Sequence, residues 1–103
     1  MNIEERVKVA ILVKYYGKIL TERQQTILEM YVDNNLSLQE VSEELGISRQ
    51  AVKDAIDNAI QTLNSTEEKL GFVARDEKLK NIIEDNKQLD MLTKIQLIAL
   101  LED

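Results

Sequence analysis

The sequence predicts an all-α protein, and three observations carry this prediction. The chain of 103 residues contains no proline and only 3 glycines, so it lacks the turn residues that an all-β fold requires. Apolar residues recur at helical spacing through most of the chain. Serine or threonine precedes several of these segments, where helix caps are expected. We therefore expect a helical bundle with an extended C-terminal helical arm.

The first helix is expected over residues 3–16. Its apolar residues follow helical spacing, although the alternation of valine and isoleucine from Val7 to Val13 would also suit a strand. We favour the helix because the segment is long for an edge strand and no pairing partner follows it. Gly17 is expected to end this helix in the left-handed conformation. The apolar residues at helical spacing are Ile3, Val7, Ala10, Ile11 and Tyr15.

Two further helices are predicted from N-terminal capping boxes, in which two side chains three residues apart cap the first turn. The earlier helix runs to about Asp33, where Asn34 and Asn35 interrupt it. The later one is short and ends at Leu45, and Gly46 supplies the following turn. The two capping boxes are Thr21 with Gln24 and Ser37 with Glu40.

The remaining helices lead into the C-terminal arm. A fourth helix is expected from its cap, Ser48, to Leu63, and Asn64 and Ser65 are expected to end or kink it. A charged helix follows, and Thr93 is expected to cap a short helix with few polar positions. That last helix is too apolar to lie free in water, so it either folds back on the core or forms a homodimer contact.

Residues 36–56 have the pattern of a helix-turn-helix motif. Such a motif needs small or apolar residues where two helices touch, and a turn residue that tolerates positive φ. The residues that meet these needs in order are Val41, Ser42, Leu45, Gly46, Ile47, Val52 and Ala55. We assign residues 1–64 to an N-terminal helix plus helix-turn-helix domain. Residues 65–103 form the C-terminal helical arm, with a role in packing or dimerisation.

The motif predicts which residues would contact nucleic acid, because the first turn of its second helix enters the major groove. Arginine can read guanine and glutamine can read adenine through paired hydrogen bonds. The alternative is that the basic side chains of this helix pair with neighbouring acids on a solvated face. The candidate binding residues are Ser48, Arg49, Gln50 and Lys53, with Lys14, Lys18 and Arg23 as an auxiliary basic surface.

The charge balance argues against unassisted binding of nucleic acid. The chain has a net charge of −6, and residues 21–64 are its most acidic third, whereas residues 1–20 are basic. Affinity for the phosphate backbone comes from lysine and arginine displacing counterions. Asp54 and Asp57 are also expected close to that backbone, where each carboxylate would repel phosphate.

Composition removes several other classes of function. The absence of cysteine and histidine excludes zinc sites, disulfides, thiol nucleophiles and serine–histidine relays. We expect no catalytic residue, metal or cofactor, and no enzymatic activity. The longest apolar run, Val9 to Val13, is far shorter than the roughly 20 residues that span a bilayer. With Glu4 and Glu5 at its start the chain does not resemble a signal peptide, so we expect a cytoplasmic protein without membrane insertion.

A family resemblance rests on the segment YYGKILTERQQTILEMYVDNNLSLQEVSEELGISRQAVKDAI, which EEKL follows. It resembles the YlxM-type family of small bacterial helix-turn-helix proteins over about residues 13–70. LTERQ and SRQAV are its most specific parts. The resemblance implies a domain similar to region 4 of bacterial sigma factors, with a longer C-terminal helix. It also implies that the residues that would contact DNA bases are Ser48, Arg49, Gln50 and Ala51.

Two departures from the family pattern concern the same helix. Lys53 stands where the family often has tyrosine, and Asp57, Asn58 and Ala59 replace residues that are more basic in a sigma-like module. These replacements weaken any claim of tight phosphate binding.

The resemblance also implies a function. Genes of this family lie beside those for the targeting GTPases Ffh and FtsY, which implies a link to the signal recognition particle. We therefore expect a regulatory or adaptor protein that binds Ffh, FtsY or the particle RNA. The alternative is a sequence-specific transcriptional regulator that binds DNA as a dimer, with two recognition helices about one turn of DNA apart.

Overall fold

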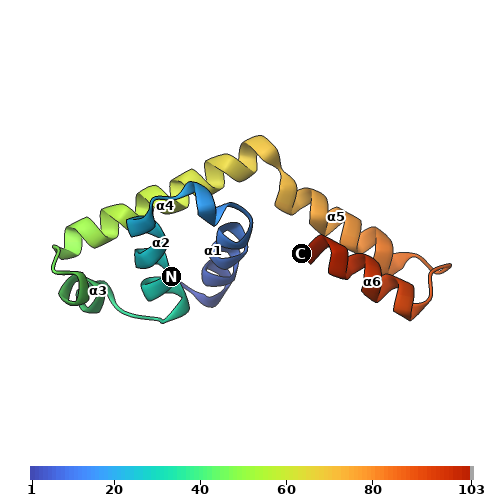
Figure 1. Ribbon diagram of the computed structural model, residues 1–103, viewed down its shortest axis with the longest axis horizontal. Helices are drawn as coiled ribbons and strands as arrows, with labels where there is room; N and C mark the ends of the chain where they lie inside the picture. The colour runs from blue at the N-terminus through green and yellow to red at the C-terminus, as the bar shows by residue number, and fades with distance from the viewer. Residues whose placement is uncertain (103) are drawn as a thin grey trace. The chain divides into compact units, whose positions relative to one another are not determined.

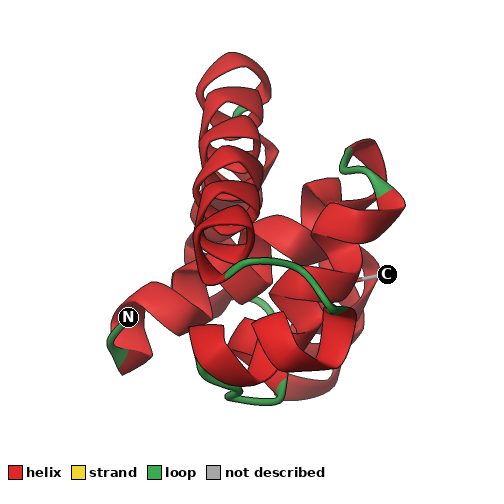
Figure 2. Cartoon of the chain, turned by 90° about the vertical axis from the view of Figure 1, so that its left-hand side faces the viewer, coloured by secondary structure: helices red, strands yellow, loops and turns green. Residues whose placement is uncertain are grey.

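The computed structural model describes residues 1–102, and this part of the chain consists of helices joined by short turns, without a strand (Figures 1 and 2). The predicted all-α fold is confirmed. The chain divides into two compact units, Met1–Leu70 and Gly71–Asp103. The helices are α1 (Ile3–Tyr16), α2 (Glu22–Leu28), α3 (Leu38–Leu45), α4 (Arg49–Leu70), α5 (Phe72–Asp85) and α6 (Met91–Glu102).

The core of the first unit forms where α1, α2 and α3 pack against α4 (Figure 1). On the inner face of α4, Val52, Ile56, Ala59 and Leu63 form a buried apolar stripe. Burial of each large apolar side chain contributes roughly 1.5–3 kcal/mol, so this stripe is a main source of stability. The other buried apolar side chains are Val9, Leu12, Tyr16, Leu20, Ile27, Leu28 and Val41.

The bounds of α1 agree with the prediction, but its inner face does not. Ile3, Val7 and Ile11 are exposed, with Ile3 at 80%, and the helix buries a different set of apolar residues. Periodicity could not choose between the faces because α1 carries apolar side chains on both. Gly17 also differs from the prediction, since its φ of −56° is right-handed and leads into a 3-10 turn at Gly17–Ile19.

The second predicted helix begins as expected and ends differently. The capping box is present, with the Gln24 backbone N–H donating to Thr21 Oγ1 at 3.1 Å. After Leu28 the chain widens into a π-helical turn, Glu29–Asp33, which the sequence reasoning missed. The predicted interruption follows, and Asn35 has a φ of 56°.

The π-helical turn is fastened to α1 by Arg6. Its Nη1 donates to the carbonyl oxygens of Tyr31 at 2.9 Å and Val32 at 3.1 Å. The last carbonyls of a helix lack intrahelical donors, and here the guanidinium group supplies them. The same group lies 5.7 Å from the centre of the Tyr31 ring. One of the basic residues of the N-terminal segment therefore has a structural role.

The helix α4 continues through Asn64 and Ser65 to Leu70, so the predicted break at these residues is wrong. Asparagine and serine cost well under about 1 kcal/mol inside a helix, so they are weak breakers by themselves. The extended part of α4 is also held to α1, because the Tyr16 hydroxyl donates to Glu67 Oε1 at 2.5 Å. The helix ends before Gly71, whose φ of 67° is left-handed.

The second unit is a hairpin of α5 and α6 (Figure 1). The predicted cap of the last helix is wrong, because Asp90 rather than Thr93 caps it, and the Asp90 carboxylate accepts the Thr93 N–H at 2.7 Å. Lys80 Nζ joins the two helices through Glu102 Oε1 at 2.9 Å. Within residues 71–102 no apolar side chain is buried. The unit therefore has no core of its own.

Candidate nucleic-acid interface

The turn between α3 and α4 is built as the sequence predicts. Gly46 follows α3 with a φ of 67° and ψ of 32°, the left-handed conformation that a side chain strains. A Cβ at Gly46 would meet no atom within 4 Å, so the backbone angle rather than space requires glycine. Ser42 closes the turn, because its hydroxyl donates to the Ile47 carbonyl at 2.5 Å and its own carbonyl accepts the Ile47 N–H at 3.2 Å.

Both predicted serine caps of the motif are confirmed. The Glu40 N–H donates to Ser37 Oγ and the Ser37 N–H donates to Glu40 Oε1, each at 3.0 Å. Backbone and side-chain hydrogen bonds with Ser37 lower the pKa of Glu40. Ser48 Oγ accepts the Ala51 N–H at 3.0 Å. The candidate reading residue Ser48 therefore also begins α4.

The other candidate reading residues share the exposed side of α4. Arg49, Gln50 and Lys53 are exposed in the first turns of the helix, whereas Val52 and Ile56 face the core. The structure thus brings the predicted residues of the second helix together on one accessible surface. We call this surface, which comprises α3, its turn and residues 48–57, the α3–α4 end (Figure 1).

Two of these side chains are already hydrogen-bonded to acids on the same helix. Gln50 Nε2 donates to Asp54 Oδ1 at 2.8 Å. Lys53 Nζ lies 2.7 Å from Asp57 Oδ2, and the hydrogen bond from Lys53 to this carboxylate raises the pKa of the lysine. Arg49 makes no ion pair with any residue that the structure describes. Of the two alternatives for the basic side chains, pairing holds for Lys53 and not for Arg49.

Further acids lie on the neighbouring helix of the motif. Glu40, Glu43 and Glu44 of α3 are exposed and, with Leu36, line a shallow depression. The α3–α4 end therefore offers arginine, glutamine and lysine side chains in a strongly acidic setting. Such a surface lacks the dense positive charge that phosphate-backbone binding draws on.

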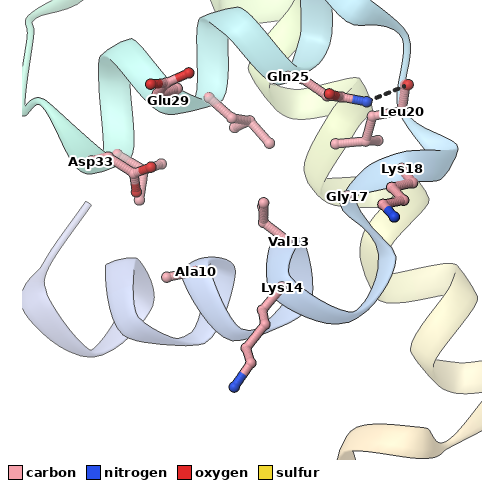
Figure 3. A pocket seen from close by; sticks show the side chains of 11 residues that line it. Ala10, Val13, Lys14, Gly17, Lys18, Leu20, Gln25, Glu29 and Asp33 are labelled. Atoms are coloured by element: carbon pink, nitrogen blue, oxygen red, sulfur yellow. Dashed lines mark hydrogen bonds between the residues drawn. The ribbon is translucent and has the colours of Figure 1, made fainter. Parts of the chain in front are cut away.

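The predicted auxiliary basic residues do not gather at one place. Lys14 and Lys18 border a groove of about 480 Å³ between α1 and the π-helical turn, where Glu29 and Asp33 form the opposite side (Figure 3). The Lys14 side chain points away from that acidic side in Figure 3. Arg23 instead borders a separate depression beside Leu45 of α3. Only Arg23 lies near the helix-turn-helix motif.

The sequence contains a local signal for these two acid contacts. Residues four apart face each other on a helix, so the spacing of Gln50 with Asp54 and of Lys53 with Asp57 predicts both contacts. No comparable signal marks Arg6, since its acceptors are backbone atoms 25 and 26 residues away.

The fold and this surface define the chain as a helix-turn-helix protein. Residues 3–101 match the family described as "Putative helix-turn-helix protein, YlxM / p13 like". A UPF0122 protein of Desulforamulus reducens is 43% identical over 89 residues, covering 85% of this chain and 76% of the relative. A second, from Acetivibrio thermocellus, is 42% identical over 88 residues, covering 82% and 75%. The chain belongs to this YlxM/p13-like family, UPF0122.

Membership of a helix-turn-helix family supports a regulatory role that involves nucleic-acid binding. It also supports a protein that acts by binding rather than by catalysis. Among the described helices, none has the length and apolar character needed to cross a membrane. In the same part of the chain, no cluster of acidic side chains could hold a metal ion.

Proposed function

We propose that the protein is a regulatory or adaptor protein of the cytoplasm that binds a component of the signal recognition particle pathway through its α3–α4 end. The observation that carries this proposal is the exposed helix-turn-helix surface in an acidic setting. Arg49 is free to contact a partner, whereas Asp54 and Asp57 hold the next two polar side chains. A protein or a folded RNA that presents its own positive or polar groups suits this surface better than naked duplex DNA does.

The choice of pathway rests on the family. The sequence resemblance implies that YlxM-type genes accompany those for Ffh and FtsY, and the chain belongs to the YlxM/p13-like family. The candidate partners are accordingly Ffh, FtsY and the particle RNA.

Binding to purified Ffh, FtsY and particle RNA tests this function, with affinity measured at moderate salt. We expect one of the three to bind, and Arg49→Ala to weaken that binding by about tenfold, as interface arginines often do. Lys69→Ala is the matched control, because it removes one positive charge from the last turn of the same helix. Arg49→Ala should leave the melting temperature nearly unchanged. Absence of binding to all three would remove the pathway from the proposal.

A second candidate function is that of a transcriptional regulator that binds DNA as a homodimer. The observation that favours it is the second unit, whose apolar side chains are not buried within the unit. Two copies of the α5–α6 hairpin would form a four-helix bundle that covers these side chains and joins two recognition helices in one molecule, as binding to two half-sites requires. Selection from a random pool of DNA duplexes at low salt tests this function. A palindromic sequence that depends on Arg49 and Gln50 would support it, and no enrichment would oppose it.

A further inference from the structure

Two carboxylates share the exposed arc of the recognition helix with the residues that would read DNA. Successive residues of an α-helix are about 100° apart, so Gln50, Lys53, Asp54 and Asp57 fall within an arc of about 100°. All four are exposed, and they point away from the buried side of α4 that Val52 and Ile56 form. A duplex that approached the first turns of α4 would meet the acids and the reading residues together.

Each carboxylate also holds a donor that a duplex would need. Asp54 Oδ1 accepts one of the two Gln50 Nε2 hydrogens at an N···O distance of 2.8 Å, and this bond holds the amide in an orientation that competes with the paired contact to adenine. Asp57 lies 2.7 Å from the Lys53 ammonium, which is the nearest positive charge for a phosphate on this arc. Of the three candidate side chains, Arg49 alone is not held by a carboxylate that the structure describes.

We infer that Asp54 and Asp57 are specificity-determining residues that make duplex DNA a poor ligand of the α3–α4 end. The inference rests on the proposed function only in taking this end as the binding surface. The two pairs are exposed and weak, so a strong competitor could break them. The charges remain when the pairs break, and phosphates within a Debye length of about 10 Å are repelled.

The test is the affinity of the full-length chain for a short, fluorescein-labelled duplex of mixed sequence, measured by anisotropy at about 0.1 M salt, where the Debye length is about 10 Å. The double variant Asp54→Asn with Asp57→Asn keeps the side-chain shapes and removes both negative charges. We expect it to bind the duplex about tenfold more tightly than the unchanged protein. The gain should shrink as salt is added, because the freed lysine displaces counterions from phosphate.

Two controls separate this local effect from net charge. Glu68→Gln with Glu77→Gln makes the same change in charge, and Glu68 lies about 16 Å beyond Asp57 along α4, outside the Debye length. This control should change the affinity less than twofold. Adding Lys53→Ala to the double asparagine variant should reduce its gain, because the freed lysine supplies part of it, whereas adding Lys69→Ala should not.

Two results would overturn the inference: an unchanged affinity of the double asparagine variant, or an equal gain in the glutamine control. Unchanged helicity and melting temperature, measured by circular dichroism, ensure that all variants are compared as folded proteins. Because the probe is DNA alone, failure of the chain to bind Ffh, FtsY or the particle RNA would leave this result unaffected.

Discussion

At the scale of single residues, Arg6 shows how a basic side chain can be structural rather than functional. Its guanidinium group is half-buried and donates to two carbonyls of the π-helical turn. Lys14 and Lys18, in contrast, are exposed at the edge of a groove. The positive charge of the N-terminal segment is therefore only partly accessible to a partner.

Arg6→Ala should destabilise the first unit by about 1–3 kcal/mol, because it leaves the carbonyls of Tyr31 and Val32 without a donor. Urea unfolding followed by circular dichroism measures this change. Lys8→Ala, two positions away on the exposed side of α1, is the matched control and should lie within about 0.5 kcal/mol of the unchanged protein. Equal stability of the two variants would show that Arg6 does not hold the π-helical turn.

At the scale of secondary-structure elements, the short helix α3 depends on its capping box. The backbone N–H of Ser37 donates to Glu40, and this bond lowers the pKa of the Glu40 carboxyl below its usual value near 4.5. A carboxyl whose pKa is lower in the folded state stabilises the fold above its unfolded pKa. That contribution is lost as the pH falls through the lowered pKa.

The stability advantage of the unchanged protein over Glu40→Gln should therefore shrink as the pH falls from about 6 to about 3.5. Urea midpoints of both proteins across this range give the measurement. Glu44→Gln is the control, since it makes the same charge change on α3 at a side chain without a cap bond. A constant difference across the range would argue that the Glu40 charge does not contribute to the cap.

Elements differ in how far the sequence predicts them. The bounds of α3 and the starts of α2 and α4 follow from capping residues and glycine, which act within one helical turn. The end of α4 does not follow from nearby residues in the same way. Asn64 and Ser65 only weakly disfavour a helix, and contacts with residues distant in the chain outweigh this effect. The π-helical turn of α2 is stabilised by Arg6, which is remote in the chain.

At the scale of the whole molecule, the second unit raises the question of what covers its apolar side chains. A unit below roughly 40 residues usually needs a partner, a metal or disulfides to be stable. Ile82 is 63% exposed, Leu92 65% and Leu100 71%. We propose that a second copy of the hairpin covers them, because it would supply the same apolar surface and close a symmetric bundle.

Sedimentation velocity at increasing protein concentration should therefore show a monomer–dimer equilibrium. Leu92→Asp should shift this equilibrium toward the monomer by at least about tenfold, because it places a charge among the apolar side chains of α6. Ile3→Asp changes an apolar residue of α1 that is even more exposed than Leu92, and it should leave the equilibrium unchanged. A chain that stays monomeric at every concentration would exclude dimerisation through α5 and α6.

The sequence by itself determined the helical class, the helix-turn-helix motif, its caps and Gly46, because each depends on neighbours within a few residues. It also placed Arg49, Gln50 and Lys53 on one helix face. The tertiary structure set which side of α1 is buried, where α4 ends and that Arg6 supports the π-helical turn. These outcomes depend on contacts between residues far apart in the chain, such as Tyr16 with Glu67, which local pattern cannot encode.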